Sequence, residues 1–167
     1  MSSYKEISTA ELENVFKLIG KDWMLITAAD GEHVNCMTAS WGNMGVLWGK
    51  DVCTVFIRPQ RYTYEFVEKT DKISLSFFGG NYRDALKLCG TVSGRDHDKI
   101  KEAGLTSSFY EGTPIINEAD TVLICKKLYA DDIREEKFVV NDPLVNYENK
   151  DFHRFYICKI EKVLKKD

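Results

Sequence analysis

The sequence predicts one mainly β domain, an antiparallel β-barrel or sandwich with a few peripheral helices. Three observations lead to this prediction: strand patterns outnumber helix patterns, most connections are short, and 167 residues suit a single domain, 1–167. Strands that alternate regularly with crossover helices would predict a parallel sheet instead, and the chain lacks that pattern. A chain of this length buries about two-thirds of its unfolded surface, so we expect no disulfide or structural metal.

Six segments carry strand patterns. Residues 52–57 are almost wholly apolar, which predicts a strand covered on both faces. Apolar residues alternate with serine from Ile73 to Phe77, the two-residue period of a strand. Asp30-Gly31 is a hairpin turn signal. The predicted strands are residues 23–28, 34–41, 52–57, 73–78, 121–128 and 152–163.

Four segments carry helix patterns. The first, within residues 1–20, begins at a capping box of Ser8 and Glu11 and continues with an apolar stripe of helical spacing. Asn81 and Asp96 stand where they can cap the third and fourth helices. The predicted helices are residues 8–20, 62–69, 82–89 and 97–103.

Composition and charge exclude several classes of protein. The formal net charge is -3, which argues against a protein that binds bulk nucleic acid. The longest apolar runs fall well short of 18 residues, and the first eight residues are polar, so we expect neither a transmembrane helix nor a signal peptide. The five cysteines form no C-x-x-C motif, which favours reduced thiols. We therefore expect a cytoplasmic protein without a membrane or nucleic-acid partner.

A first candidate site lies in the segment from Asn35 to Trp41. Thr38 and Ser40 are two positions apart, so on a strand both hydroxyls point to the same face. Two hydroxyls beside free main-chain amides can hold an oxyanion. The alternative for this segment is an ordinary half-polar strand.

A second candidate site follows the most apolar predicted strand. Arg58 ends that strand, and burying its charge is costly unless it has a partner. Arg61 and Thr63 open the next predicted helix, whose first amides are unpaired and attract anions. Guanidinium, hydroxyl and helix N-terminus together suit a phosphate group, and the alternative is a solvated turn.

A third candidate site is the segment from Ser93 to Lys99. Capping by Asp96 is a sufficient structural reason for much of this segment. Lys99, one turn into the predicted helix, can add a second positive charge near a phosphate. The alternative is a helix cap surrounded by solvated charges.

Other reactive motifs are missing from the sequence. There is no G-x-G-x-x-G, no P-loop, no H-E-x-x-H and no cysteine or histidine spacing typical of zinc. The three histidines are scattered, and the acidic run from Asp131 to Glu136 is interpreted as a solvated face. We therefore expect no metal site and assign no catalytic residue.

These segments together resemble the flavin reductase-like, FMN-binding split-barrel family, particularly its flavoredoxin-like branch. The resemblance rests on three segments in order: residues 35–78, which begin NCMTASW and include IRPQRYT; residues 89–105, CGTVSGRDHDKIKEAGL; and residues 116–129, INEADTVLICKKLY. It runs in order through residues 21 to 130. Residues 131–150 match no motif and are expected to form an irregular insertion that shapes the substrate side.

The resemblance implies a homodimer of antiparallel split β-barrels with FMN, held without a covalent link, at the subunit interface. The flavin ring would be lined by Asn35, Cys36, Met37 and Thr38. The phosphate would be held by Thr38, Ser40, Arg61 and Thr63, with Lys99 nearby. The pocket would be shaped by Trp41, Arg58 and Tyr62. The cysteine at position 36 is unusual for the family.

The function implied by this resemblance is a flavin-dependent oxidoreductase. Electrons would come from NAD(P)H or a protein donor and pass through FMN to a small-molecule or protein acceptor. A chain with hydroxyls and arginines but no acid–base cluster suits a protein whose cofactor performs the chemistry. Two alternatives stay open: an FMN-binding electron carrier or sensor without efficient NAD(P)H turnover, and a related barrel that holds another ligand such as heme.

Overall fold

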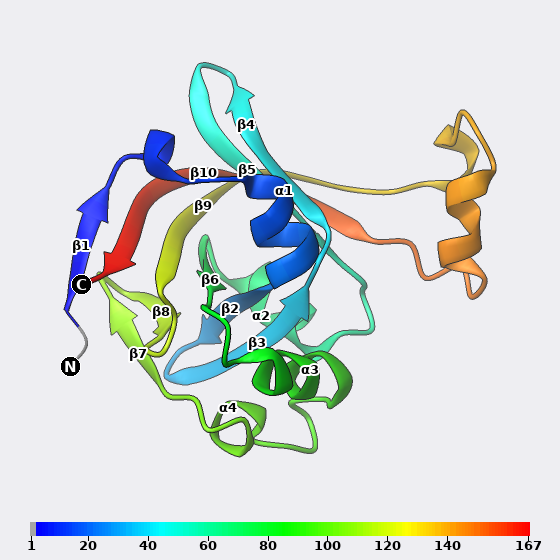
Figure 1. Cartoon of the computed structure of the whole chain (residues 1–167). Helices are drawn as coiled ribbons and strands as arrows, with labels where there is room; N and C mark the ends of the chain where they lie inside the picture. The colour runs from blue at the N-terminus through cyan, green and yellow to red at the C-terminus, as the bar shows by residue number, and fades with distance from the viewer. Residues whose placement is uncertain (1–2) are drawn as a thin grey trace.

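A computed structural model describes residues 3–167 as a strongly curled antiparallel sheet with helices at its ends (Figure 1). The strands are β1 (Tyr4–Ile7), β2 (Met24–Asp30), β3 (His33–Ala39), β4 (Gly42–Leu47), β5 (Lys50–Ile57), β6 (Lys72–Phe77), β7 (Ser107–Tyr110), β8 (Thr113–Ile116), β9 (Thr121–Asp132) and β10 (Arg154–Lys166). The helices are α1 (Val15–Lys17), α2 (Tyr62–Lys69), α3 (Arg83–Thr91) and α4 (Lys99–Glu102), with shorter turns η1 (Thr9–Glu11), η2 (Leu18–Asp22), η3 (Glu135–Lys137) and η4 (Asp142–Tyr147). The predicted mainly β, antiparallel architecture is confirmed.

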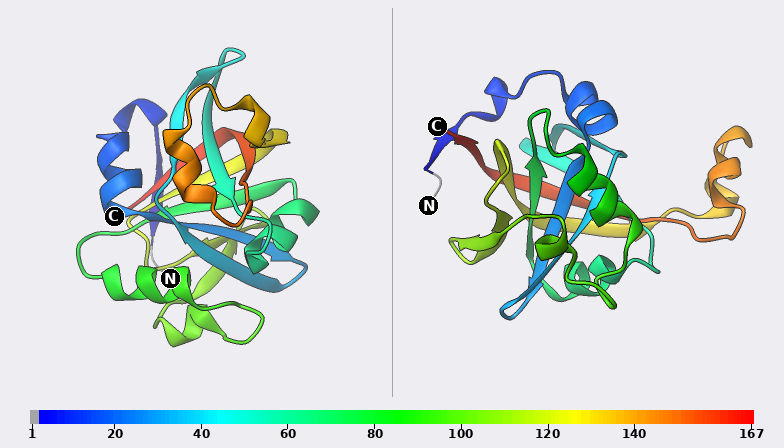
Figure 2. Two further views of the ribbon diagram at one scale, coloured as in Figure 1. Left: turned by 90° about the vertical axis from the view of Figure 1, so that its right-hand side faces the viewer. Right: turned by 60° about the horizontal axis from the view of Figure 1, so that its bottom comes forward.

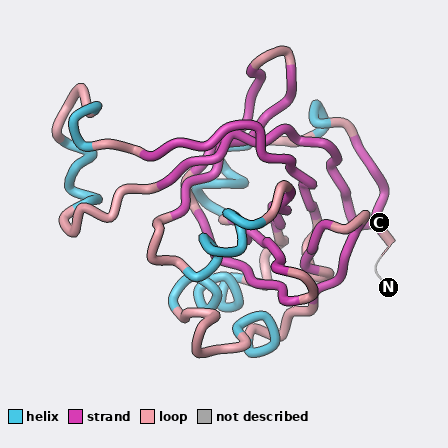
Figure 3. The backbone as a smooth tube through the Cα atoms, turned by 180° about the vertical axis from the view of Figure 1, so that it is seen from behind, coloured by secondary structure: helices cyan, strands magenta, loops and turns pink. Residues whose placement is uncertain are grey.

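The strand order explains why the sheet curls into an incompletely closed barrel. The order is β3-β2-β6-β9-β10-β5-β4, and β1 pairs with β10 at the side. β3 and β4 are the two ends of this path, yet only Ser40 and Trp41 separate them in the sequence. The two ends must therefore meet at a seam, although β3 and β4 share no ladder within residues 3–167. Figure 3 shows the strands wrapping around a common interior.

Tight hairpins hold the strands in register. Asp30 pairs with His33 across the β2–β3 turn, as the Asp30-Gly31 signal predicts. The β4–β5 turn consists of Trp48 and Gly49, which both have positive φ, 54° and 65°. Two central residues with positive φ form the turn type whose twist matches that of paired strands.

The core has two parts, one inside the barrel and one outside it. Ile73, Leu75 and Phe77 of β6 point into the barrel interior. The opposite face of β6 is covered as well, because the Ser74 hydroxyl donates a hydrogen bond to the Pro114 carbonyl of β8. α3, α4 and the β7–β8 hairpin enclose this second, outer core.

The N-terminal segment departs from the single helix predicted over residues 8–20. The capping box of Ser8 and Glu11 forms, but it closes only the short turn η1. Helical structure is interrupted before Asn14, which has φ 44°, and resumes as α1 and the π-helical turn η2. Short apolar stretches can satisfy their contacts in several short turns, so the periodic stripe was not sufficient evidence for one helix. Residues 1 and 2 of this prediction lie outside the described residues.

Two predicted helix caps are also wrong. Tyr82, not Asn81, precedes α3, and it makes no side-chain cap hydrogen bond. α4 is capped by Asp98, whose carboxylate accepts from the Lys101 amide, so Asp96 lies outside the helix. The predicted helix over residues 62–69 is confirmed with the same bounds.

The sequence prediction missed three strand regions: β1, β4 and the β7–β8 hairpin. β9 and β10 extend beyond the predicted segments and lead into a projecting arm, residues 133–153, which carries η3 and η4 (Figure 2). Two register shifts in the β9–β10 ladder let these long strands bend. Within residues 3–167 no helix has the length and apolar character needed to cross a bilayer.

Candidate functional site

A cavity of about 200 Å³ lies at the seam where β3 leads into β4; it is called the seam cavity below. It brings together six residues predicted for the cofactor site and three others. The nine lining residues are Met37, Thr38, Ala39, Ser40, Trp41, Phe56, Arg58, Arg61 and His153.

Two side-chain hydroxyls at the end of β3 line one wall of the seam cavity. Thr38 and Ser40 both line the cavity, as the two-residue spacing predicts. The Thr38 hydroxyl donates to the Leu86 carbonyl of α3, which fixes its rotamer. Trp41, which is exposed, covers the end of the cavity beside Ser40.

Arg58 has the partner that its position at the end of β5 requires. Its guanidinium forms an ion pair of 2.5 Å with the Asp151 carboxylate and donates to the Asn146 carbonyl at 2.9 Å. It also lies over the Tyr147 ring, 5.2 Å from the centroid. All three partners belong to the arm, so Arg58 ties the arm to the wall of the seam cavity.

Two cations meet at one carbonyl group: Arg61, which lines the seam cavity, and Lys99, which does not. Arg61 donates to the Cys89 carbonyl at 3.4 Å, and the Lys99 ammonium donates to the same carbonyl at 3.2 Å and to Val92 at 3.4 Å. Lys99 is only 3% exposed, and burial lowers the pKa of both Arg61 and Lys99. Neither cation has a carboxylate partner in the described part of the chain, so the pair carries positive charge that the protein leaves uncompensated.

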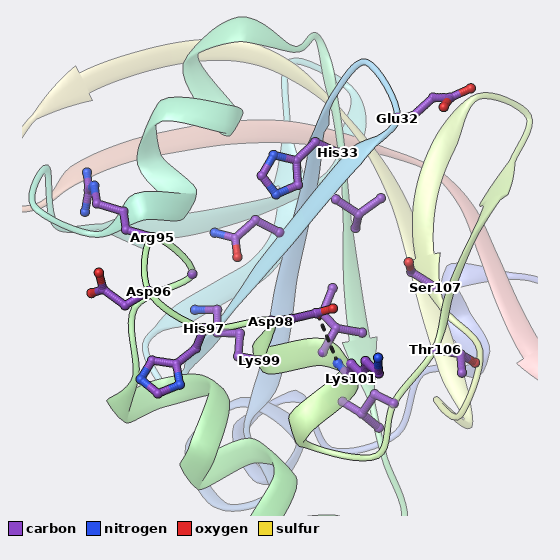
Figure 4. Close-up of a pocket in the computed structure, with 15 residues that line it drawn as sticks. Glu32, His33, Arg95, Asp96, His97, Asp98, Lys99, Lys101, Thr106 and Ser107 are labelled. Carbon is purple, nitrogen blue, oxygen red and sulfur yellow. Dashed lines mark hydrogen bonds between the residues drawn. The ribbon is translucent and has the colours of Figure 1, made fainter.

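A second cavity, about 700 Å³ in volume, is lined by Asn35, Lys99 and the segment that leads into α4 (Figure 4). Its charged side chains come from the β2–β3 turn, the loop before α4 and α4 itself. Gly94 in that loop approaches Asn35 so closely that a Cβ would lie 2.3 Å from the amide oxygen. Glycine is therefore required where the loop crosses β3.

The remaining predicted residues line neither cavity. Thr63 is buried in the first turn of α2 and accepts a hydrogen bond of 3.0 Å from the Asn35 amide. Tyr62 packs edge-on against Phe66, with ring centroids 4.9 Å apart. Thr63 thus positions the Asn35 side chain, while Tyr62 packs within the first turn of α2 against Phe66.

Cys36 is fully buried in the outer core beside Cys89. A hydrogen bond with the Cys89 thiol, and then burial, raise the pKa of Cys36 well above its ordinary value. These two cysteines are 53 positions apart in the sequence, so only the fold reveals that they are neighbours. All five cysteines are free and buried.

His153 is the polar residue of the seam cavity that sequence reasoning missed. It is buried between Trp41, at 5.1 Å between ring centroids, and Phe56, at 6.4 Å. Its Nδ1 lies 2.8 Å from the Tyr147 hydroxyl. Burial, followed by the Arg58 charge, lowers the pKa of His153 to about 4, so the ring is neutral at pH 7. A lone histidine within the strand predicted over residues 152–163 gave no signal that distinguishes it from a surface residue.

A comparison with protein-family models matches residues 17–165 to the flavin reductase like domain. The chain belongs to this family. The match covers the seam cavity, the two cations and the arm, and it confirms the resemblance found in the sequence. A search of curated protein sequences finds no significant match.

Solved structures share the fold at low sequence identity. An FMN-binding domain of a flavin reductase-like enzyme from Shewanella baltica OS155 aligns with TM-score 0.70 and 17% identity, over 98% of this chain and 78% of that one. Flavoredoxin of Desulfovibrio vulgaris (Miyazaki F) aligns with TM-score 0.68 and 19% identity, over 98% of this chain and 77% of that one. An FMN-binding protein from Thermus thermophilus, with bound p-hydroxybenzaldehyde, aligns with TM-score 0.66 and 22% identity, over 98% of this chain and 81% of that one. The predicted split barrel is thereby confirmed.

Proposed function

We propose that this chain binds FMN without a covalent link at the seam cavity and acts as a flavin-dependent oxidoreductase. The observation that carries the proposal is the meeting of Arg61 and Lys99 at the Cys89 carbonyl without a carboxylate partner in the described residues. Placing two uncompensated cations together, Lys99 buried and Arg61 half-buried, is unfavourable unless an anion joins them. A phosphate group, with two negative charges, supplies that anion and forms charge-assisted hydrogen bonds with both.

The rest of the seam cavity fits both ends of FMN. Thr38 and Ser40 add hydroxyls for the phosphate, and Trp41 and His153 offer flat ring surfaces for the other end. FMN supplies two-electron redox chemistry, so the protein needs only to bind and orient it. The cavity, about 200 Å³, is smaller than FMN, and we infer that a second chain supplies the missing wall in a homodimer. The buried free thiols fit a reducing compartment, and we propose that the protein is cytoplasmic.

Absorption spectroscopy of the purified protein tests the cofactor. We expect a yellow protein with flavin bands close to those of free FMN, and release of FMN by acid or heat. A colourless protein that does not bind added FMN at micromolar concentration would refute the proposal. A heme spectrum would support the alternative ligand instead.

Steady-state oxidation of NADH and NADPH tests the reaction. Turnover with either nucleotide supports a reductase that takes electrons from NAD(P)H. Bound FMN without turnover would identify the protein as an electron carrier or sensor that depends on a protein donor. The nucleotide preference follows from the ratio of kcat/KM for NADH and NADPH.

A further inference from the structure

Tyr147 and His153 form a buried pair that joins the arm to the seam cavity. His153 lies in the wall of the cavity, and Tyr147 belongs to η4 of the arm. The Tyr147 hydroxyl lies 2.8 Å from His153 Nδ1, and each of the two residues is only 7% exposed. Tyr147 does not line the cavity, so its hydroxyl can influence a ligand there only through His153.

The direction of this hydrogen bond follows from the groups around it. In the part of the chain that the structure describes, the Tyr147 hydroxyl has no other hydrogen-bond partner, so its hydrogen is satisfied only if Nδ1 accepts it. Burial raises the pKa of Tyr147, so the phenol keeps that hydrogen at neutral pH. Burial and then the Arg58 charge lower the pKa of His153, so its ring is neutral. A neutral imidazole carries one N–H, and Nδ1 as the acceptor leaves that hydrogen on Nε2.

The Nε2 nitrogen of His153 is available to a ligand. It makes no hydrogen bond with any residue between 3 and 167, and it is not among the polar side-chain atoms that these residues shut off from solvent without a partner. Trp41, Phe56 and Tyr147 pack around the imidazole, with ring centroids at 5.1, 6.4 and 5.5 Å. Since His153 lines the seam cavity, the open space beside Nε2 is that cavity.

We propose that His153 donates a hydrogen bond from Nε2 to the flavin ring system, and that Tyr147 is the positioning residue that holds His153 in this tautomer. This inference rests on the proposed function, because it places FMN in the seam cavity. Two-electron reduction of FMN adds negative charge to the ring system, and a hydrogen bond to a charged acceptor is stronger than one to a neutral acceptor. The pair therefore stabilises reduced FMN more than oxidised FMN and raises the midpoint potential. Neither electrons nor protons pass through the pair in this role.

The tautomer of His153 can be measured without the cofactor. Heteronuclear NMR distinguishes a protonated from an unprotonated imidazole nitrogen, and the chain has only three histidines to assign. We expect His153 in the FMN-free wild-type protein at pH 7 to carry its hydrogen on Nε2. Tyr147→Phe, which keeps the ring and removes the hydroxyl, should shift the Nδ1 resonance. A hydrogen on Nδ1 in the wild-type protein would overturn the inference, whatever the protein binds.

The midpoint potential of bound FMN measures the effect on the cofactor. We expect His153→Phe to reduce the preference for reduced over oxidised FMN about tenfold, which lowers the potential by about 30 mV. Tyr147→Phe should reduce this preference about fivefold, or about 20 mV. His153→Gln, which retains an N–H donor, should stay within about twofold of the wild-type protein. Adding Tyr147→Phe to His153→Phe should cause no further change, because Tyr147 acts through His153.

Tyr4→Phe is the matched control. It also removes one hydroxyl, which donates to the Ala119 carbonyl at 2.9 Å, but Tyr4 belongs to β1 and does not line the seam cavity. We expect this variant to have the potential of the wild-type protein.

A purely structural role for the pair predicts a different result. His153→Phe and Tyr147→Phe would then weaken oxidised and reduced FMN equally and leave the potential unchanged, which would overturn the inference while the proposed function stands. A further loss on adding Tyr147→Phe to His153→Phe would overturn the positioning role of Tyr147. Tyr147→Phe decides the question if His153→Phe does not fold or does not hold FMN. Failure of the wild-type protein to bind FMN would instead refute the proposed function, and this inference with it.

Discussion

Arg61 stands half-buried beside the seam cavity with only a carbonyl as its partner in the described residues, so its charge is available to a ligand. We expect Arg61→Ala to weaken FMN binding about 10- to 150-fold, because one charge-assisted contact worth roughly 1.5–3 kcal/mol is lost. Riboflavin, which lacks the phosphate, is expected to be affected far less. Fluorescence titration with both ligands measures the two Kd values.

Arg95→Ala is the control for Arg61→Ala. Arg95 also lies near α2, but the Glu65 carboxylate already pairs with it. We expect FMN affinity to change less than about twofold in this variant. Equal loss of FMN and riboflavin affinity in Arg61→Ala would mean that Arg61 contacts the ring or supports the fold instead.

Cys36 is predicted to be a bystander to the chemistry, although the fold places Cys89 beside it. Its raised pKa keeps the thiol protonated, and its side chain lines neither cavity. We expect Cys36→Ala to keep FMN binding and to change the rate of NAD(P)H-driven flavin reduction by less than about threefold, under 1 kcal/mol of barrier. Stopped-flow reduction measures this rate. A hundredfold loss with FMN still bound would show that the thiol takes part.

His153 makes the stability of the protein depend on pH. Its pKa is about 4 in the folded protein and near 6.5 in the unfolded chain, so the unfolded chain binds more protons between these values. The contribution of neutral His153 is therefore complete above about pH 6.5 and is lost as the pH falls toward 4. We expect a loss of up to about 2 kcal/mol in the free energy of unfolding from this group, measured by denaturant titration.

His153→Phe is the matched variant for the pH measurement, because phenylalanine keeps a ring against Trp41 and Phe56 but cannot titrate. Its unfolding free energy should fall less steeply between pH 6.5 and 4 than that of the wild-type protein. Identical slopes in the two proteins would mean that other groups cause the acid destabilisation.

The residues of the candidate site could be predicted from the sequence where they lie close together along the chain. Thr38, Ser40 and Trp41 end one strand and Arg61 follows another, so periodicity and strand ends place them in one region. His153 was not predictable in this way, because its neighbours come from distant segments. The partner of Arg58 was not predictable either, since Asp151 lies 93 residues away.

The arm is the element that sequence patterns described least. Its aromatic residues form a small cluster of their own, in which Tyr147 stacks on Phe152 at 4.7 Å and Phe138 lies 6.1 Å from each ring. These contacts join residues within one irregular segment and have no period of 2 or 3.6. The barrel strands, by contrast, were predictable because their alternation reflects two distinct faces.

Asp151 anchors the arm to the barrel through Arg58 and through a hydrogen bond of 2.8 Å from Gln60. We expect Asp151→Asn to increase amide hydrogen exchange in residues 133–150 about tenfold, because a charge-assisted contact that opposes local opening is weakened. Exchange in β5 and β6 should not change. Asp142→Asn, at an exposed position of η4, is the control and should leave the exchange pattern unaltered.

At the scale of the whole molecule, apolar side chains remain exposed on the outer side of β4, β5, β9 and β10. A chain of ring contacts runs from Trp48 at the β4–β5 turn through Tyr129 to Phe155 and Phe56, with centroids 6.1–6.5 Å apart. The arm carries further exposed side chains, and Val139 is 97% exposed. Both the hairpin and the arm project from the barrel in Figure 2. An apolar surface that projects in this way is typical of an interface with another chain.

We therefore predict a homodimer that uses this surface and closes the seam cavity. Light scattering of the FMN-bound protein should give twice 19.2 kDa, about 38 kDa. Trp48→Asp should shift the mass toward the monomer, because it puts a charge into the apolar surface, while aspartate tolerates the positive φ of this turn position. Phe109→Asp, at an exposed aromatic residue of β7, is the control and should remain dimeric. A mass of about 19 kDa for the FMN-bound wild-type protein would contradict the prediction and would require the seam cavity to hold FMN without a second chain.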